Sequence, residues 1–320
     1  MIGQNIDKAK SLLKRGEVIG FPTETVYGLA ANAYNETAVK AIFTIKGRPH
    51  TSPLIVHTSD LARVRSFVKC IPAQAMLLAE TFWSGPLTLL LEKLPSISDT
   101  VTAGLPTVGI RIPRHPLSLK LLEAISFPVA APSANPFGYI SPTTAEHVEE
   151  QLGSQIPYIL DGGPCQAGLE STIVGFQHEK AVIYRLGSIT QEELEDVIGP
   201  LSYVHPTDEK KGAFLAPGRT KHHYAPRTPM RVGDLSTLVA QHAGQRVVAL
   251  CFDKPIDSLS LAEQVILSPK KSLQEAAKSL FAGLHQLDKL GADVIIAPVF
   301  PEEGLGRVIN ERLKRASSVG

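Results

Sequence analysis

The sequence FPTETVYGLA at residues 21–30, followed by KGRPHTSPLIVH at residues 46–57, decides the fold of this chain. Residues 18–21 predict a short apolar strand that breaks at a proline and enters a loop rich in hydroxyls with one carboxylate. Residues 37–45 predict a helix because their apolar residues recur at helical spacing. The chain then returns through a second apolar strand at residues 54–56, so this stretch predicts a strand–helix–strand unit.

Two cations, Lys46 and Arg48, stand in the turn that follows the predicted helix. Gly47 and Pro49 fix this turn. Arg offers a planar fork for bidentate phosphate contacts and Lys a compact point charge, so the pair suits a polyanion such as a nucleoside triphosphate. The alternative is a surface turn whose charges are merely solvated. Spacing alone leaves both interpretations open.

Length and charge narrow the class of protein. A chain of 320 residues with 43% hydrophobic and 20% charged residues predicts a packed core and two domains. Residues 1–200 contain 16 Lys and Arg against 19 Asp and Glu, a net charge of −3. Because a surface that tracks nucleic acid needs many cations, any positive site in this part must be local.

The cysteines and the apolar runs indicate the compartment. Cys70, Cys165 and Cys251 are far apart and form no C-x-x-C, which argues against a disulfide framework and favours a reducing cytosol. The first residues read as an amphipathic helix and not as a signal peptide. No apolar run reaches about 18 residues, so we expect a cytoplasmic protein without a membrane span.

Two further stretches present polar side chains from apolar surroundings. Residues 107–113 predict a strand that carries Arg111, and a buried guanidinium needs a partner. That partner is either a ligand carboxylate or an internal Asp or Glu. In the loop 132–138, prolines and a glycine hold Ser133 and Asn135 in a stiff turn. These two side chains either face a ligand or bond only their own backbone.

Helices and strands alternate along the rest of the chain, which predicts an α/β fold with a partly parallel sheet. We expect Thr143 and Glu146 to form a capping box at one helix, and Ser272 and Glu275 to form another at a helix over 272–289. The domain boundaries we predict are 1–200 for the first domain, 201–229 for a linker rich in Pro, Gly and charge, and 230–320 for a small second domain.

FPTETVYGLAANA, KGRPHTSPLIVH and, at 216–226, APGRTKHHYAP together resemble the signatures of the YrdC/Sua5 family. The resemblance implies a YrdC-like twisted mixed sheet with flanking helices, a linker over the active site, and a small Rossmann-like α/β C-terminal domain of the Sua5 type. Two positions depart from the family pattern: Ser52 replaces the usual Asn, and Ala216 replaces the usual Ser. The C-terminal domain lacks G-x-G-x-x-G, so we expect no dinucleotide there.

The resemblance also implies a reaction. Members of this family are threonylcarbamoyl-AMP synthases, nucleotidyltransferases that convert L-threonine, bicarbonate and ATP to threonylcarbamoyl-AMP and pyrophosphate. The product serves the threonylcarbamoyl modification of adenosine at position 37 of certain tRNAs. Mg²⁺ would assist, downstream tRNA threonylcarbamoyl transferase proteins would be partners, and direct contact with tRNA is a further option. Since the chain has no P-loop, scattered cations and hydroxyls would have to hold the triphosphate.

Matching the family motifs residue by residue implies three groups of site residues and no protein-held metal. The first, a catalytic quartet, consists of Lys46, Arg48, Ser133 and Asn135. The second group would contact ATP and consists of Arg48, Ser52, Thr107, Ser133, Ser141, Arg185 and Tyr224. The third would contact threonine and consists of Thr25, His57, Arg111, Ser171 and, through its backbone, Ala131.

Two other classes remain to be weighed against a synthase. One is a non-catalytic module that binds double-stranded RNA, which the net charge of −3 over residues 1–200 disfavours. The other is a carbamoyl transferase resembling the related domain of hydrogenase maturation proteins. Those proteins carry acylphosphatase and zinc-finger regions, which this chain lacks.

Overall fold

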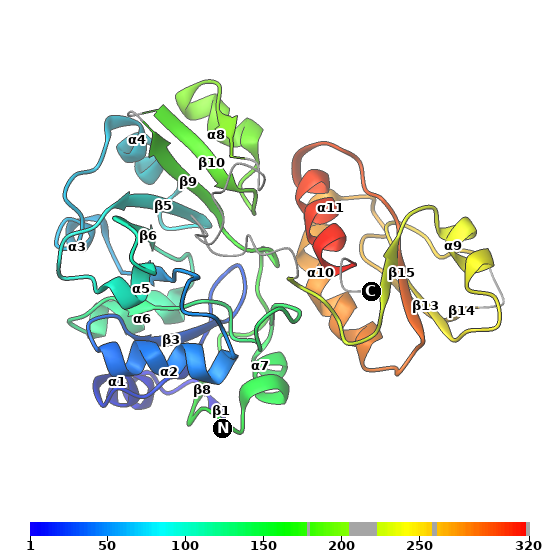
Figure 1. The fold of residues 1–320 in the computed structure, drawn as a ribbon, viewed down its shortest axis with the longest axis horizontal. Coiled ribbons are helices and arrows are strands. Elements are labelled where there is room, and N and C mark those ends of the chain that lie inside the picture. The colour runs from blue at the N-terminus through cyan, green and yellow to red at the C-terminus, as the bar shows by residue number, and fades with distance from the viewer. Residues whose placement is uncertain (178–179, 205–222, 258–260, 318–320) are drawn as a thin grey trace. The chain divides into compact units, whose positions relative to one another are not determined.

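The computed structural model describes residues 1–177, 180–204, 223–257 and 261–317, and the chain divides into two compact units (Figure 1). The first unit comprises Met1–Phe137, Pro142–Gln166 and Glu170–Arg219. The second comprises Gly138–Ser141, Ala167–Leu169 and Thr220–Gly320. Most of the predicted linker, including Ala216, falls at 205–222 and lies outside the described residues.

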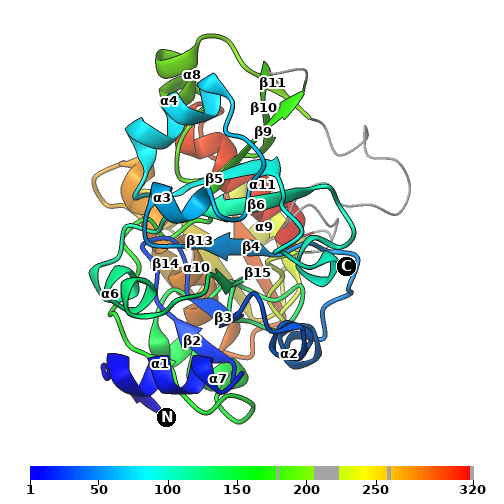
Figure 2. The same ribbon diagram turned by 90° about the vertical axis from the view of Figure 1, so that its left-hand side faces the viewer.

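A mixed sheet organises the first unit. Its described strands follow the order β1-β8-β2-β3-β7-β4-β6-β5-β9-β10-β11. Figure 2 shows the central strands in this order, from β2 and β3 through β4 and β6 to β5, β9 and β10. Their bounds are β1 Ile2–Gly3, β2 Ile19–Phe21, β3 Gly28–Asn32, β4 Ile55–His57, β5 Leu87–Glu92, β6 Thr107–Arg111, β7 Val129–Ala130, β8 Ile159–Leu160, β9 Thr172–Gln177, β10 Lys180–Arg185 and β11 Ser202–Tyr203.

The strands pair in both senses. β4 runs parallel to β6, β5 parallel to β9, and β2 parallel to β8, whereas β2–β3, β4–β7, β5–β6 and β9–β10 are antiparallel. This arrangement confirms the predicted twisted mixed sheet. The flanking helices are α1 Ile6–Lys14, α2 Glu36–Lys46, α3 Leu61–Val64, α4 Ala73–Phe82, α5 Asp99–Thr102, α6 Pro116–Ala124, α7 Ala145–Leu152 and α8 Gln191–Ile198.

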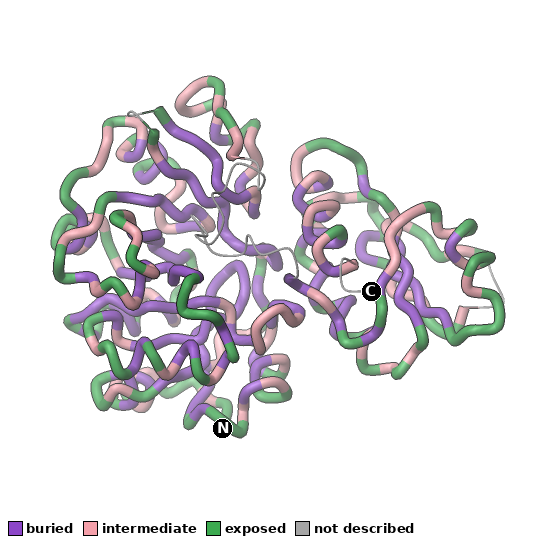
Figure 3. The backbone as a smooth tube through the Cα atoms, viewed as in Figure 1, coloured by how far each residue is buried: buried purple, intermediate pink, exposed green. Residues whose placement is uncertain are grey.

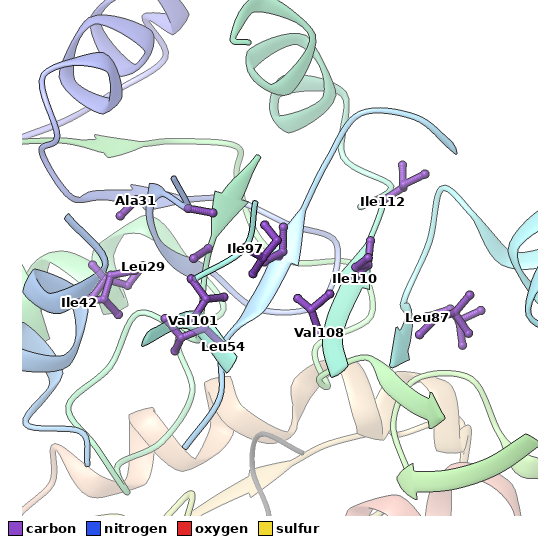
Figure 4. Packing of buried hydrophobic residues seen from close by; sticks show 14 of the residues in the cluster. Leu29, Ala31, Ile42, Leu54, Leu87, Ile97, Val101, Val108, Ile110 and Ile112 are labelled. Atoms are coloured by element: carbon purple, nitrogen blue, oxygen red, sulfur yellow. The ribbon is translucent and has the colours of Figure 1, made fainter. Parts of the chain in front are cut away.

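The main core lies on one face of this sheet. Because side chains alternate along a strand, Val56 of β4, Leu89 of β5 and Ile110 of β6 all point to the core face, and Figure 4 shows Ile110 among its neighbours. Burying each such side chain contributes roughly 1.5–3 kcal/mol. The same alternation sends His57 and Arg111 to the opposite face.

The opposite face differs between the two halves of the sheet. At β2, β3 and β7 it packs on the helices α1 and α6, through side chains that include Ile19, Phe21 and Leu121. At β4, β5, β9 and β10 it carries a small apolar cluster consisting of Ile55, Leu90, Ile173, Val182 and Tyr184. The polar side chains of His57 and Arg111 also lie on this second half. Figure 3 shows that much of the backbone of the central strands is buried. The sheet therefore presents its polar groups beside β4 and β6.

The second unit is a parallel sheet of four described strands in the order β12-β15-β13-β14, as expected for a Rossmann-like domain. Its strands are β12 Met230–Val232, β13 Val247–Cys251, β14 Leu261–Ile266 and β15 Val294–Ala297. Its helices are α9 Leu235–Gln241, α10 Leu273–Asp288 and α11 Gly304–Ala316. Within the described residues, no helix is both long and apolar enough to cross a membrane.

Both predicted capping boxes need correction. Thr144, not Thr143, caps α7, because its Oγ1 accepts the His147 N–H at 3.3 Å. At α10 the Ser272 Oγ accepts the Glu275 N–H as predicted. The Glu275 carboxylate does not return to the Ser272 backbone but accepts a hydrogen bond from the Ser268 hydroxyl at 2.6 Å. A nearby hydroxyl thus competes successfully with the backbone for that carboxylate.

Gly47 caps α2 in the left-handed region, with φ of 61°. A Cβ at this position would meet nothing within 4 Å, so only backbone strain opposes a side chain. We expect Gly47→Ala to lower the free energy of unfolding by about 1 kcal/mol, and Gly47→Asn by less, since Asn tolerates this conformation. Urea unfolding followed by the fluorescence of Trp83, the single tryptophan, checks this, because Trp83 lies in the first unit. Equal stability of wild type and Gly47→Ala would contradict it.

Candidate functional site

The loop between β2 and β3 folds across the face of the sheet. Thr23 stiffens it locally: the Thr23 hydroxyl donates to the Val26 carbonyl at 2.6 Å and lies 2.8 Å from the Thr25 hydroxyl. Three strands separate β2 from β6 in the sheet order, at about 4.8 Å per step, yet Thr25 contacts Arg111 at the end of β6. The loop must therefore pass over the intervening strands.

Arg111 is buried, with 4% of its surface exposed, and has partners on three sides. Its Nη1 donates to the Thr25 hydroxyl at 2.8 Å and its Nε to the Gly85 carbonyl at 3.2 Å. Its Nη2 lies 2.8 Å from a carboxylate oxygen of Glu24, which is also buried. Of the two partners that the sequence left open, the internal acid is thus present.

His57 lies beside Arg111 on the neighbouring strand, and the two residues are in register between β4 and β6. Burial, followed by the charge of Arg111, lowers the pKa of His57 to about 3. The imidazole is therefore neutral near pH 7 and adds no charge to the guanidinium. Together with Thr25 these residues form what we call the Arg111 cluster: Glu24, Thr25, His57 and Arg111.

Ser171 and Arg185, which we assigned to different ligands, contact each other. The Arg185 Nη2 donates to the Ser171 carbonyl at 2.8 Å and to its hydroxyl at 3.1 Å. The Ser171 hydroxyl lies 2.8 Å from that of Thr88 on β5. All three side chains are buried, so any ligand that reaches Ser171 also meets the field of Arg185.

Lys46 fastens the loop that contains Ser133 and Asn135. Its Nζ donates to the Ser133 carbonyl at 2.6 Å and to the Asn135 carbonyl at 2.5 Å. Burial, followed by the charge of Arg48, lowers the pKa of Lys46 well below its usual value. The two hydrogen bonds from the Lys46 Nζ therefore position this loop, a role that the sequence did not indicate.

Arg48 is buried and turns toward its own loop. Its Nη2 donates to the Ser52 hydroxyl at 2.5 Å and to the Pro53 carbonyl at 3.0 Å, and its guanidinium lies 5.9 Å from the centre of the Phe137 ring. Ser52, the residue that departs from the family pattern, thus supports Arg48 directly. Burial of Arg48 also excludes the simplest alternative from the sequence, a solvated surface turn.

The two groups of residues adjoin through the same loop. The Ala134 N–H donates to the Tyr27 carbonyl at 2.8 Å, and Gly28 forms a β-bridge with Ser133. Ala131 follows β7, and its N–H donates to the Ile55 carbonyl at 2.9 Å, so its carbonyl is the backbone group left to consider as a ligand contact. Thr107 begins β6, on the same face as Arg111.

Ser141 and Tyr224 belong to the second unit. The Ser141 carbonyl lies 3.1 Å from the Nε2 of His285. Tyr224 is fully buried, with φ of 66°; its ring stacks on Phe281 at 5.5 Å and lies 5.0 Å from the guanidinium of Arg312. Packing inside this unit therefore accounts for the Tyr224 ring, and its predicted contact with ATP stays a prediction.

The sequence did not point to two members of this site. Glu24 was noted only as the carboxylate of a polar loop, and Thr88 was not singled out. The sequence does contain an indication of Glu24. A buried Arg in a strand requires an acidic partner, and Glu24 of FPTET directly precedes Thr25, a predicted site residue. Among the described residues, no group of three or more His, Cys, Asp or Glu side chains is arranged to hold a metal ion.

Comparison with known proteins identifies the family. A family model described as "Telomere recombination", for Sua5, YciO and YrdC, matches residues 11–187. A second, described as "Threonylcarbamoyl-AMP synthase, C-terminal domain", matches residues 189–318. The chain belongs to the Sua5/YciO/YrdC family. The predicted membership is thereby confirmed, and the second match marks the longer, Sua5-type members.

Relatives in this family cover the chain almost completely. Proteins named threonylcarbamoyl-AMP synthase from Bacillus subtilis and Pyrococcus abyssi are 40% and 39% identical, over 98% and 97% of this chain and 92% and 93% of theirs. The crystal structure of P. abyssi Sua5 complexed with L-threonine superposes with a TM-score of 0.92 at 37% identity, covering 99% of this chain and 97% of that one. Escherichia coli YciO, 22% identical with a TM-score of 0.52 over 58% of this chain and 93% of its own, shares the fold.

The buried neutral His57 predicts loss of stability in acid. Below the unfolded pKa of 6.5 the unfolded chain takes up a proton that folded His57 refuses until about pH 3, so stability falls as the pH drops through this window. From pH 7 to pH 5 the His57 contribution is a loss of about 2 kcal/mol. We expect His57→Gln to lose less than wild type by about that amount in urea unfolding followed by Trp83 fluorescence. The exposed His50→Gln serves as control, and parallel losses in His57→Gln and wild type would contradict this expectation.

Proposed function

We propose that this protein is an L-threonylcarbamoyladenylate synthase. The observation that carries the proposal is the near full-length match to synthases of the same family, combined with the placement of the predicted side chains. One cluster gathers Lys46, Arg48, Ser133 and Asn135, and an adjoining one surrounds Arg111. These clusters provide positive charge without a glycine-rich phosphate loop, as the predicted reaction requires.

Each cluster takes one substrate in this proposal. Arg48 and the loop bearing Ser133 and Asn135 bind the triphosphate of ATP, while Lys46 keeps that loop in place. Ser52 supports Arg48, and Thr107 and Arg185 contact the nucleotide. Ser141 and Tyr224 stay predicted nucleotide contacts. Arg111 binds the carboxylate of L-threonine, assisted by Thr25, His57, Ser171 and the Ala131 backbone. An Arg carries five N–H donors; in Arg111 two of them bind Gly85 and Thr25, and Nη2 lies beside Glu24, so N–H groups are left for this task.

The chemistry then depends mainly on positioning. Threonine and bicarbonate combine to N-carboxythreonine, whose carboxylate attacks the α-phosphate of ATP and displaces pyrophosphate. Fixed cations and hydroxyls in a buried site stabilise the charge that shifts onto the leaving group, and they need little reorganisation during the reaction. Buried groups such as Arg48 and Arg111 meet this requirement, since their own hydrogen bonds already hold them.

Mg²⁺ would arrive with ATP and screen its phosphates, since this ion is commonly bound through substrate phosphates and few protein groups. The product would pass in the cytoplasm to tRNA threonylcarbamoyl transferase proteins that modify adenosine 37 of tRNA. The unpaired cysteines fit that reducing compartment.

The function is tested by mass detection of the adenylated product while each substrate is omitted in turn. We expect threonylcarbamoyl-AMP and pyrophosphate only when ATP, L-threonine and bicarbonate are all present. Replacing threonine and bicarbonate with carbamoyl phosphate should give no adenylate. Product from carbamoyl phosphate instead would assign the chain to carbamoyl transfer, and no adenylate under any condition would reject the synthase.

Arg111→Lys separates the two substrate sites. The substitution keeps the charge but removes the planar fork, so we expect the threonine KM to rise by about 10- to 100-fold while the ATP KM changes little. Steady-state pyrophosphate release with each substrate varied checks this. Asp99→Asn, which removes an exposed partner of Lys93 elsewhere in the unit, is the control. An unchanged threonine KM in Arg111→Lys would remove Arg111 from the threonine site.

A further inference from the structure

Glu24 is a buried carboxylate whose bonding is incomplete. Only 7% of the residue is exposed, and it pairs with Arg111 at 2.8 Å. That contact lacks hydrogen-bond geometry, and neither Glu24 oxygen accepts a hydrogen bond from any described residue. Thr23 and Thr25, its neighbours in the chain, direct their hydroxyls to each other.

Such an arrangement is costly unless a ligand completes it. Leaving a buried polar group without a hydrogen bond is unfavourable, and more so for a charged group. The nearby guanidinium compensates the charge of Glu24 but does not satisfy its oxygens. A donor that enters the site and points at Glu24 would therefore bind with a favourable electrostatic and hydrogen-bonding contribution.

The proposed position of threonine supplies that donor. In any α-amino acid the nitrogen is only two bonds from the carboxylate carbon. If the carboxylate binds Arg111, the amino group lies within reach of the acid that contacts the same guanidinium. We propose that Glu24 binds the amino group of threonine and accepts the proton that this group must lose before it is carboxylated. The inference rests on the proposed function and extends it to the first chemical step.

The proton balance of this step requires an acceptor. Threonine is bound as its ammonium form, R–NH₃⁺, whose nitrogen has no free electron pair. Transfer of one proton to Glu24 gives R–NH₂ and a neutral carboxylic acid. The amine then attacks the carbon of bicarbonate; an N–C bond forms, a C–O bond breaks and water leaves, giving R–NH–COO⁻. Glu24 afterwards returns its proton to solvent.

Among the described ionisable groups near Glu24, none of the others is suited to accept the proton of the threonine ammonium. Arg111 is cationic, and the pKa of His57, beside Arg111 on the neighbouring strand, is lowered to about 3 by burial and by the charge of Arg111, so neither group readily accepts a proton. The thiol of Cys165 is also near. Burial, followed by the charge of Glu24, raises the pKa of Cys165, so this thiol remains protonated and cannot take the proton. The competing explanation is that Glu24 is a positioning residue that only holds Arg111.

Running the reaction in both directions separates these explanations. Formation of threonylcarbamoyl-AMP needs the amine to lose a proton. The reverse reaction, in which pyrophosphate and threonylcarbamoyl-AMP made by wild type regenerate ATP, releases the carbamate and does not need this step. Both directions need Arg111 in place. We therefore expect Glu24→Gln to slow pyrophosphate release by about 100-fold or more, the range of a lost general base, while ATP formation from threonylcarbamoyl-AMP stays within a few-fold of wild type.

Thr25→Val is the matched control, because it removes the Thr25 hydroxyl, another partner of Arg111, and keeps the Glu24 carboxylate. It should slow both directions by the same factor. Breaking a buried ion pair can strongly destabilise a protein, so thermal unfolding of Glu24→Gln is measured first. If that variant does not fold, Glu24→Asp and Glu24→Asn form the same comparison with a shorter side chain, since only Asp keeps a proton acceptor.

Equal losses in both directions for the amide variant, or no loss in the forward direction, would overturn the role of Glu24. These results are distinct from failure of the proposed function, in which wild type itself releases no pyrophosphate with threonine and bicarbonate. In that case the inference about Glu24 falls together with the function on which it rests.

Discussion

A guanidinium buried in a sheet is the constraint on which the rest of the first unit depends. Arg111 ends a strand whose alternate side chains build the main core, so it cannot move to solvent without disturbing that core. The charge of Arg111 must therefore be compensated inside the protein. Glu24 and Thr25 provide that compensation, because the PTET loop crosses three strands to reach Arg111. The shape of this loop is thus a consequence of electrostatics more than of local turn preference.

The same loop links the two substrate sites. Through Tyr27 and Gly28 its far end is bonded to the segment that carries Ser133, and through Glu24 and Thr25 its near end is bonded to Arg111. In the proposed reaction, N-carboxythreonine must reach the α-phosphate within bonding distance. A single rigid segment that contacts both clusters reduces the freedom that would otherwise be lost on binding.

The sequence predicted the elements with strong patterns and missed those decided by tertiary contacts. The strands predicted at 18–21 and 54–56 correspond to β2 Ile19–Phe21 and β4 Ile55–His57, within one residue at each end, because each is a short apolar run. β3, with the sequence GLAAN, was missed: Gly and Ala have weak strand preference, and only pairing with β2 and β7 makes it a strand. The candidate site residues were predicted from motifs, but the partners of Arg48, Lys46 and Arg111 depend on the fold and could not be predicted from spacing.

The tie between Lys46 and two carbonyls has a mechanical consequence. α2 ends at Lys46, and the Nζ of this residue holds the backbone at Ser133 and at Asn135 through hydrogen bonds. A shift of that loop on contact with a ligand must either stretch these short bonds or pull the last turn of the helix along with it. Arg48 is only two residues beyond Lys46, so any such movement would also displace Arg48. The Arg48 guanidinium and the loop that carries Ser133 and Asn135 would therefore move together.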